Sequence, residues 1–186
     1  MDEFFHLDRE ANLPSWFSST LWLLAAGCAL GITFEQRKDR RHWQGLVVLF
    51  IFLSLDEAAM FHERFGGAFG NVFSANDYLF FNWLLYGIIF TLIIGAIYLP
   101  FLFRLPRLTR RGLILSGAVF VSGAIGVEMF GAAVHAGVTP LGSSRIFWGI
   151  HVIAEEGLEM LGVALLIRTL LRHMAEHRPL ARIRVG

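Results

Sequence analysis

Residues 15–34, SWFSSTLWLLAAGCALGITF, form a run without a single charged side chain. Pro14 leads into this run with Ser15 as a helix cap, and Glu35-Gln36-Arg37-Lys38 ends it. About 20 apolar residues in a helix cross the roughly 30 Å hydrocarbon core of a bilayer once. The stretch therefore predicts a transmembrane helix, and the acidic segment before it argues against a cleaved secretory signal.

The rest of the chain repeats this pattern. The 186 residues are 55% hydrophobic and 17% charged, with a mean hydropathy of +0.58, and the charges are bunched between apolar runs. The pattern is typical of a chain buried by lipid. We expect an all-α integral membrane protein, a single helical domain over residues 1–186, with five transmembrane helices at about 15–34, 43–63, 78–103, 112–136 and 146–172.

Two broad classes receive no support from the composition. The net charge of +1 gives no indication of nucleic-acid binding. Cys28 is the only cysteine, which excludes an intrachain disulfide and a thiolate metal cluster.

The basic residues predict the orientation, because short cytoplasmic loops are enriched in Lys and Arg. Every second connection is basic, and those between are poor in basic residues. We therefore expect the N-terminus outside and the C-terminus in the cytoplasm. The basic segments contain Arg37, Lys38, Arg40 and Arg41; Arg104, Arg107, Arg110 and Arg111; and Arg172, Arg178, Arg182 and Arg184, whereas the other side has Arg9, Arg64 and Arg145.

With this topology, acids from three helices fall in one layer of the outer half of the bilayer. Asp56 lies about 20 Å along its helix from Trp43, and Glu128 lies about 24 Å from Gly112. The fifth helix descends and places its acids and His151 at a similar height. Seven acids share this layer with only two nearby fixed cations: Asp56, Glu57, Glu63, Glu128, Glu155, Glu156 and Glu159, against Arg64 and Arg145.

Such an excess of carboxylates is costly in a low dielectric, at several kcal/mol for each ionised group. Protons, a cation, a wet cavity or a partner must therefore compensate it. Inward-facing carboxylates and imidazoles are the ligands that helical bundles use for divalent metals, here Zn, Mn or Fe. The first-choice ligands are Asp56, Glu128, His151, Glu155 and Glu159, with His62, Glu63 and His135 nearer the rim, and with Glu57 and Glu156 as catalytic proton carriers.

An outward-facing metal site would support hydrolysis or oxidation of a lipidic or quinone-like substrate, and the sequence leaves open whether the protein is an enzyme. Three alternatives remain. Two of His62, His135 and His151 would ligate a haem. A proton or cation transporter would use the same acids, although we expect no polar residue deep in the inner half to continue its path. An accessory subunit would pair them with a membrane protein partner.

Three motifs carry a resemblance to known proteins. They are Leu55-Asp56-Glu57-Ala58 followed by His62-Glu63, then Arg104-Leu105-Pro106-Arg107, and finally Glu155-Glu156 with Leu158-Glu159-Met160-Leu161-Gly162. Together they resemble a group of uncharacterised bacterial multi-pass membrane proteins with LDEAxxxHE and EExLEMLG motifs. The resemblance spans helices two to five, implies the same membrane fold and brings no activity with it.

Overall fold

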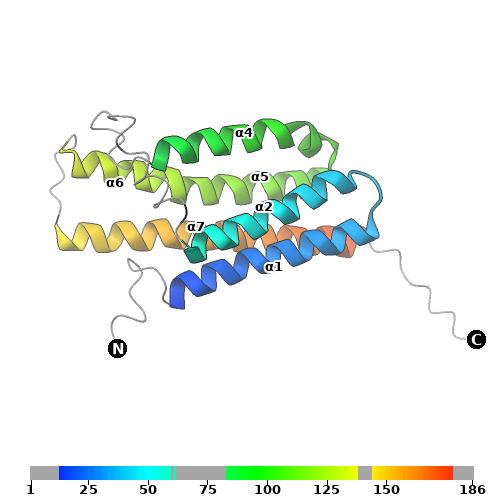
Figure 1. Cartoon of the computed structure of the whole chain (residues 1–186), viewed down its shortest axis with the longest axis horizontal. Helices are drawn as coiled ribbons and strands as arrows, with labels where there is room; N and C mark the ends of the chain where they lie inside the picture. The colour runs from blue at the N-terminus through cyan, green and yellow to red at the C-terminus, as the bar shows by residue number, and fades with distance from the viewer. Residues whose placement is uncertain (1–12, 60, 62–82, 138–143, 178–186) are drawn as a thin grey trace, which may run out of the picture.

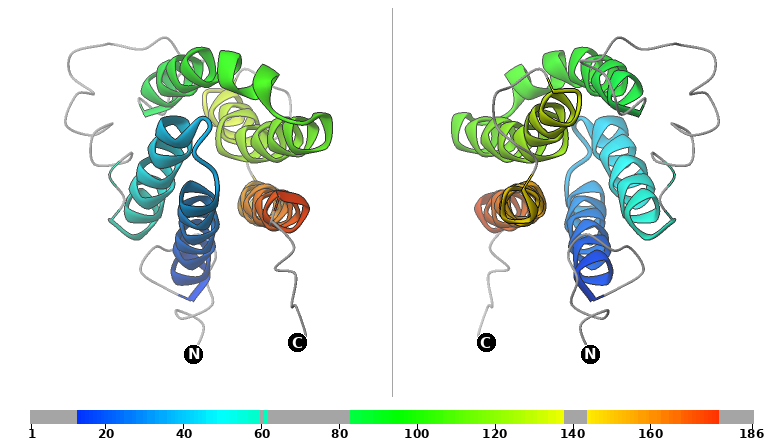
Figure 2. Two further views of the ribbon diagram at one scale, coloured as in Figure 1. Left: turned by 90° about the vertical axis from the view of Figure 1, so that its right-hand side faces the viewer. Right: turned by 90° about the vertical axis from the view of Figure 1, so that its left-hand side faces the viewer.

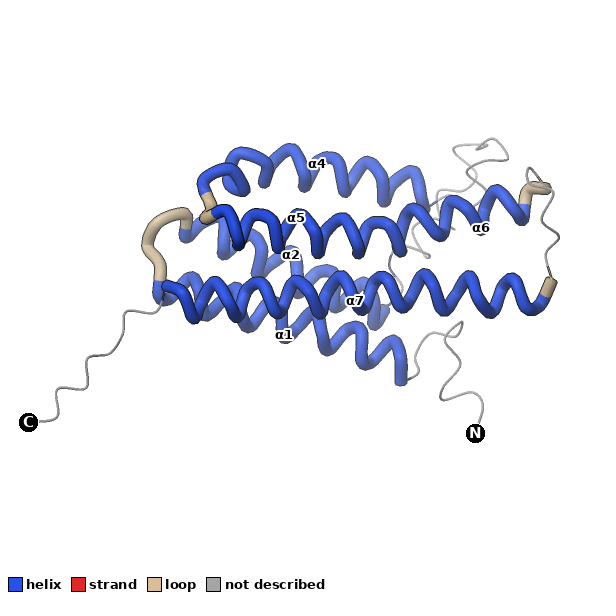
Figure 3. Tube along the Cα trace, turned by 180° about the vertical axis from the view of Figure 1, so that it is seen from behind, coloured by secondary structure: helices blue, strands red, loops and turns tan. Residues whose placement is uncertain are grey.

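The computed structural model describes residues 13–59, 61, 83–137 and 144–177, and within these ranges the chain is helical and has no strand (Figure 1). The helices are α1 (Leu13–Glu35), α2 (Arg40–Ala59), α4 (Trp83–Arg104), α5 (Arg107–Val121), α6 (Glu128–His135) and α7 (Arg145–His177). A π-helical turn, η3 (Ser122–Val127), joins α5 to α6. Figure 3 shows α5 and α6 running on as one long rod beside α7.

The helices surround a common axis. Viewed along the bundle, α1 lies between α2 and α7, α5 lies beside α7, and α4 covers the side between α5 and α2 (Figure 2). The turn between α1 and α2 lies at one end of the bundle, which we call the α1–α2 loop end. The opposite end, with α6 and the start of α7, is called the α6 end.

Three helical stretches are long and apolar enough to cross a membrane: Leu13–Glu35, Leu84–Arg104 and Arg107–His135. The other two long helices carry charges that lower their hydropathy. α2 includes Asp56 and Glu57, and α7 includes Glu155, Glu156 and Glu159. The length and composition of the described helices therefore support three spans, whereas the sequence predicted five.

The observed helices extend further at some ends than the predicted apolar runs. α5 begins at Arg107 instead of near residue 112, because Pro106 occupies the N-cap position and the amphipathic first turn is helical despite its arginines. α7 continues to His177, beyond the predicted end at 172. Residues 60, 62, 63 and 78–82, at the predicted ends of the second and third helices, lie outside the described part.

Small residues allow the helices to pack closely. Ser19 and Ser54 join α1 to α2, because each hydroxyl donates to the backbone carbonyl of the other residue, at 2.9 and 2.8 Å. On α7, Gly162 lies against the backbone of Phe120, and a Cβ there would meet Phe120 at 2.7 to 2.8 Å. Such close approach is how helices associate in membranes. It holds α7 against the rod of α5 and α6 and fixes the relative positions of their side chains.

Candidate metal centre

Three potential metal ligands converge near the α6 end. Glu128 is the first residue of α6, and His151 and Glu155 lie one turn apart on α7. One ligand atom from each side chain lies within 4.8 Å of those of the other two. Zinc binds nitrogen and oxygen ligands at about 2 Å, so shifts of less than about 1 Å would bring the three atoms around one ion.

The π-helical turn helps to place Glu128. It spans Ser122–Val127 and ends directly before this residue. A π turn changes the angular position of every residue that follows, and such turns are frequent at functional sites. Gly123 within the turn packs against α7, since a Cβ there would meet the Glu155 carbonyl oxygen at 2.8 Å. The apolar pattern of residues 112–136 does not predict this turn.

The His151 ring is buried and held from two sides. Its Nε2 lies 2.9 Å from the carbonyl oxygen of Val127, which can only accept, so Nε2 carries the hydrogen and donates it. The ring also lies against Gly131, where any Cβ would collide with it, and 5.4 Å from the ring of Trp148. Sequence reasoning identified His151 but missed Val127 and Gly131, since neither has a side chain with metal chemistry.

The hydrogen bond to Val127 leaves Nδ1 of His151 as the atom with a lone pair. This Nδ1 lies 3.6 Å from Oε2 of Glu155. Metal-bound histidines commonly donate their second N–H to a backbone carbonyl, which fixes the tautomer and the ring orientation. The surroundings of His151 match this arrangement.

The two carboxyl groups of the centre also lie close together, because one carboxylate oxygen of Glu155 lies within 4.8 Å of one of Glu128. Two ionised carboxylates this close repel each other unless a proton or a cation lies between them, and a divalent cation could occupy that position. The donor set is then one imidazole nitrogen and two carboxylates. It suits Zn, Mn or Fe and leaves at least one coordination position open.

The centre opens onto a large cavity of about 860 Å³, which is within the range of ligand-binding pockets. The structure brings seven of the ten predicted site residues to its wall, from α2, α6 and α7. Asp56 and Glu57 lie within electrostatic range of Glu159. The seven are Asp56, Glu57, Glu128, His151, Glu155, Glu156 and Glu159.

Of the remaining three predicted site residues, His135 is the one that the structure describes, and it does not join this group. His135 is exposed at the end of α6, and its ring lies 6.3 Å from that of Trp148. It is outside both the cavity wall and the three-ligand group, because α6 carries it beyond the layer of acids. His62 and Glu63 lie outside the described residues, so their predicted role as ligands stays a prediction.

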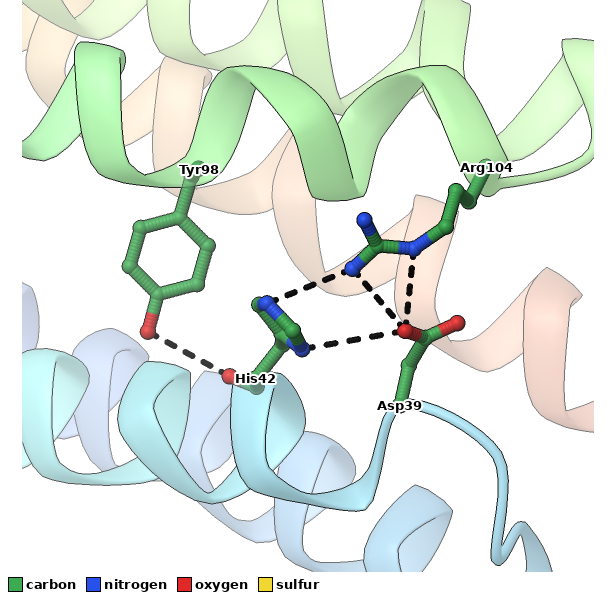
Figure 4. Close-up of polar contacts among 4 residues, drawn as sticks. All are labelled: Asp39, His42, Tyr98 and Arg104. Atoms are coloured by element: carbon green, nitrogen blue, oxygen red, sulfur yellow. Dashed lines mark hydrogen bonds and ion pairs between the residues drawn. The ribbon is translucent and has the colours of Figure 1, made fainter.

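A second polar cluster, missed by sequence reasoning, occupies the α1–α2 loop end. Asp39 binds Arg104 through Nε at 3.0 Å and through a second nitrogen at 2.9 Å, and its carboxylate lies 3.7 Å from Nδ1 of His42 (Figure 4). Arg104 also donates to Nε2 of His42 at 3.2 Å. The cluster ties the turn before α2 to the end of α4.

His173 lies deeper at the same end and is 1% exposed. One ring nitrogen is 2.9 Å from the Thr109 hydroxyl and the other is 3.0 Å from the side-chain amide of Gln36. The structure therefore has a buried polar contact at the α1–α2 loop end, the end that the predicted orientation places toward the cytoplasm. Thr109 and His173 are polar, but an apolar count along the sequence does not show that they pack together.

A family model described as Domain of unknown function (DUF8692) matches residues 1–174. The chain belongs to this family. The match covers all four helices that carry the resemblance noted from the sequence, and it supports an uncharacterised family. No curated protein and no solved structure matches the chain.

Proposed function

We propose that this protein spans a membrane and binds one divalent metal ion at Glu128, His151 and Glu155. The observation that carries the proposal is that three ligand atoms of these residues lie within 4.8 Å of one another at the wall of a large cavity. The buried imidazole, held by the Val127 carbonyl, supports a preformed nitrogen ligand.

The proposal includes the five spans, with the N-terminus outside and the C-terminus in the cytoplasm. α2 and α7 would cross the bilayer as well, because their acids face the cavity and their apolar residues can face lipid. The alternating basic segments support this orientation. The α6 end would then lie toward the outer side of a bacterial cytoplasmic membrane.

The reaction that this geometry favours is metal-dependent hydrolysis of a lipidic substrate. A divalent ion with an open position supplies an activated water and polarises a carbonyl. Glu57 and Glu156 line the cavity outside the three-ligand group and are the candidate proton carriers. A redox-active ion at the same ligands would instead support oxidation of a lipidic or quinone-like substrate, so the identity of the metal distinguishes the two reactions.

Elemental analysis of protein purified without added metal tests the proposal. We expect about one metal ion per chain in the wild type and less than about a tenth of this in Glu155→Gln, which keeps the shape but loses an anionic ligand. Glu156→Gln is the matched control, because its neighbouring carboxyl lines the same cavity but is not in the ligand group. Absence of metal from the wild type, or equal loss in both variants, would overturn the proposal.

A further inference from the structure

The cavity has a polar part and an apolar part. Its carboxylates come from the end of α2, from the start of α6 and from α7 as far as Glu159. Beyond Glu159, the lining residues on α7 are Gly162 and Leu166. Along α2 the wall continues from Asp56 to Leu46 through apolar side chains, a distance of about 15 Å at 1.5 Å per residue. A ligand that fills this space therefore needs a long apolar portion and a polar end.

Glycines on two walls leave room for such a chain. Gly95 on α4 and Gly117 on α5 both line the cavity, and a Cβ added at either would meet no atom within 4 Å. Both glycines face open space, whereas a neighbouring helix fills the space beside Gly131 and Gly162. The apolar part of the cavity is thus bounded by the helices but not filled by them.

The charge of the cavity selects the polar end of the ligand. Six acidic residues line its described wall, which includes no Lys or Arg. The bases nearest to this end in the sequence are Arg64, outside the described residues, and Arg145, which does not line the cavity. The acidic residues on this wall outnumber the basic ones whichever of them form ion pairs. One divalent ion would offset two of the negative charges. An anionic head group would meet charge of its own sign, whereas a cationic one is complementary.

We propose that the cavity binds a long-chain amine, with its alkyl chain between α2, α4 and α5 and its ammonium group among the carboxylates beside the metal centre. This names the ligand class of the proposed function and rests on it. The ammonium group would interact with Asp56, Glu57 or Glu159, which line the cavity but lie outside the metal-ligand group.

The test measures binding of radiolabelled hexadecylamine to purified protein in detergent, in competition with unlabelled hexadecylamine, hexadecanol and hexadecanoic acid. We expect saturable binding of about one amine per chain, with the amine competing at least about tenfold better than the alcohol or the acid, a difference of about 1.4 kcal/mol. Equal competition by the alcohol or the acid would overturn the preference for an amine.

Cavity-filling variants locate the binding site. Gly117→Leu and Gly95→Leu each place a side chain in open space within the cavity, and each should weaken amine binding at least about tenfold. Gly27→Leu is the matched control, because Gly27 also has nothing within 4 Å but lies on α1 away from the cavity wall. If both cavity variants melt like the wild type and bind the amine as tightly, the proposed site is wrong.

Metal content is measured on every sample, which separates the two proposals. Stoichiometric metal without amine binding would contradict this inference and leave the metal site standing. Saturable, cavity-dependent amine binding by protein without metal would contradict the metal site and retain the cavity as a site for amines.

Discussion

The two ends of the bundle use similar residues in different ways. At the α1–α2 loop end, Asp39 binds Arg104 and the buried His173 bonds to Thr109 and Gln36. At the α6 end, His151 and two glutamates face one another beside further acids on a cavity wall. At the first end Asp39, Arg104 and His173 have complementary partners, although the buried Nε1 of Trp43 has no hydrogen-bond partner among the described residues, whereas carboxylates of like charge gather at the second end. From this difference we infer that the first end stabilises the fold, and we propose that the second binds a ligand.

The largest effect is expected from removing His173. His173→Ala leaves a cavity beside Trp43 and removes two buried hydrogen bonds, so it should cost on the order of 3 kcal/mol of folding free energy. Thermal unfolding in detergent should show a clearly lower Tm. Metal content should not change, because His173 lies about 33 Å along α7 from His151. Loss of metal from a folded His173→Ala protein would erase the distinction between the two ends.

An intermediate effect is expected at Gly131. A Cβ there collides with the His151 ring, so Gly131→Ala should displace this ligand and weaken metal affinity about tenfold or more, as other changes around metal ligands do. Gly126→Ala is the control, because nothing lies within 4 Å of its added Cβ. Competition with a metal chelator measures both affinities. Equal affinity in the two variants would show that His151 is not a ligand.

The smallest effect is expected at the Asp39–Arg104 pair. Arg104 is 40% exposed, and exposed ion pairs contribute about 1 kcal/mol or less. Asp39 has a φ of 58°, a conformation that asparagine tolerates, so Asp39→Asn removes the charge while keeping the turn. We expect a slightly lower Tm at low salt and little difference from the wild type in 1 M salt, since salt screens the pair.

Asp39→Ala separates charge from conformation, because alanine lacks the side chain that stabilises a positive φ. This variant should unfold at a lower temperature than Asp39→Asn at every salt concentration. An equal loss in the two variants would mean that the charge, which both remove, and not the turn dominates at this residue.

The sequence predicted the helical class and the layer of acids because both depend on patterns within single helices. Apolar runs specify helix positions, and counting 1.5 Å per residue places Asp56 and Glu155 at similar heights. Both side chains do line one cavity. The family match supports the uncharacterised family that the motifs suggested.

The side-chain contacts within the site depend on how the helices pack against one another, and patterns within single helices do not specify this packing. The π turn directly before Glu128 changes the direction of this side chain. Counting heights along the helices therefore did not show that Glu128, and not Asp56, joins Glu155 in the three-ligand group. The sequence predicted His135 as a metal ligand near the rim, yet His135 is exposed and its ring lies 6.3 Å from that of Trp148. The hydrogen-bond partners of His173 are Gln36, directly after α1, and Thr109 on α5, and no local pattern joins them.

Anomalous X-ray scattering from crystals of the protein purified without added metal tests the central claim most directly. A peak at the absorption edge of the bound metal should lie within about 2.5 Å of a ligand atom of each of Glu128, His151 and Glu155. Crystals that diffract well and show no peak there, or a peak held by other residues, would contradict the assignment of this end of the bundle as a metal centre.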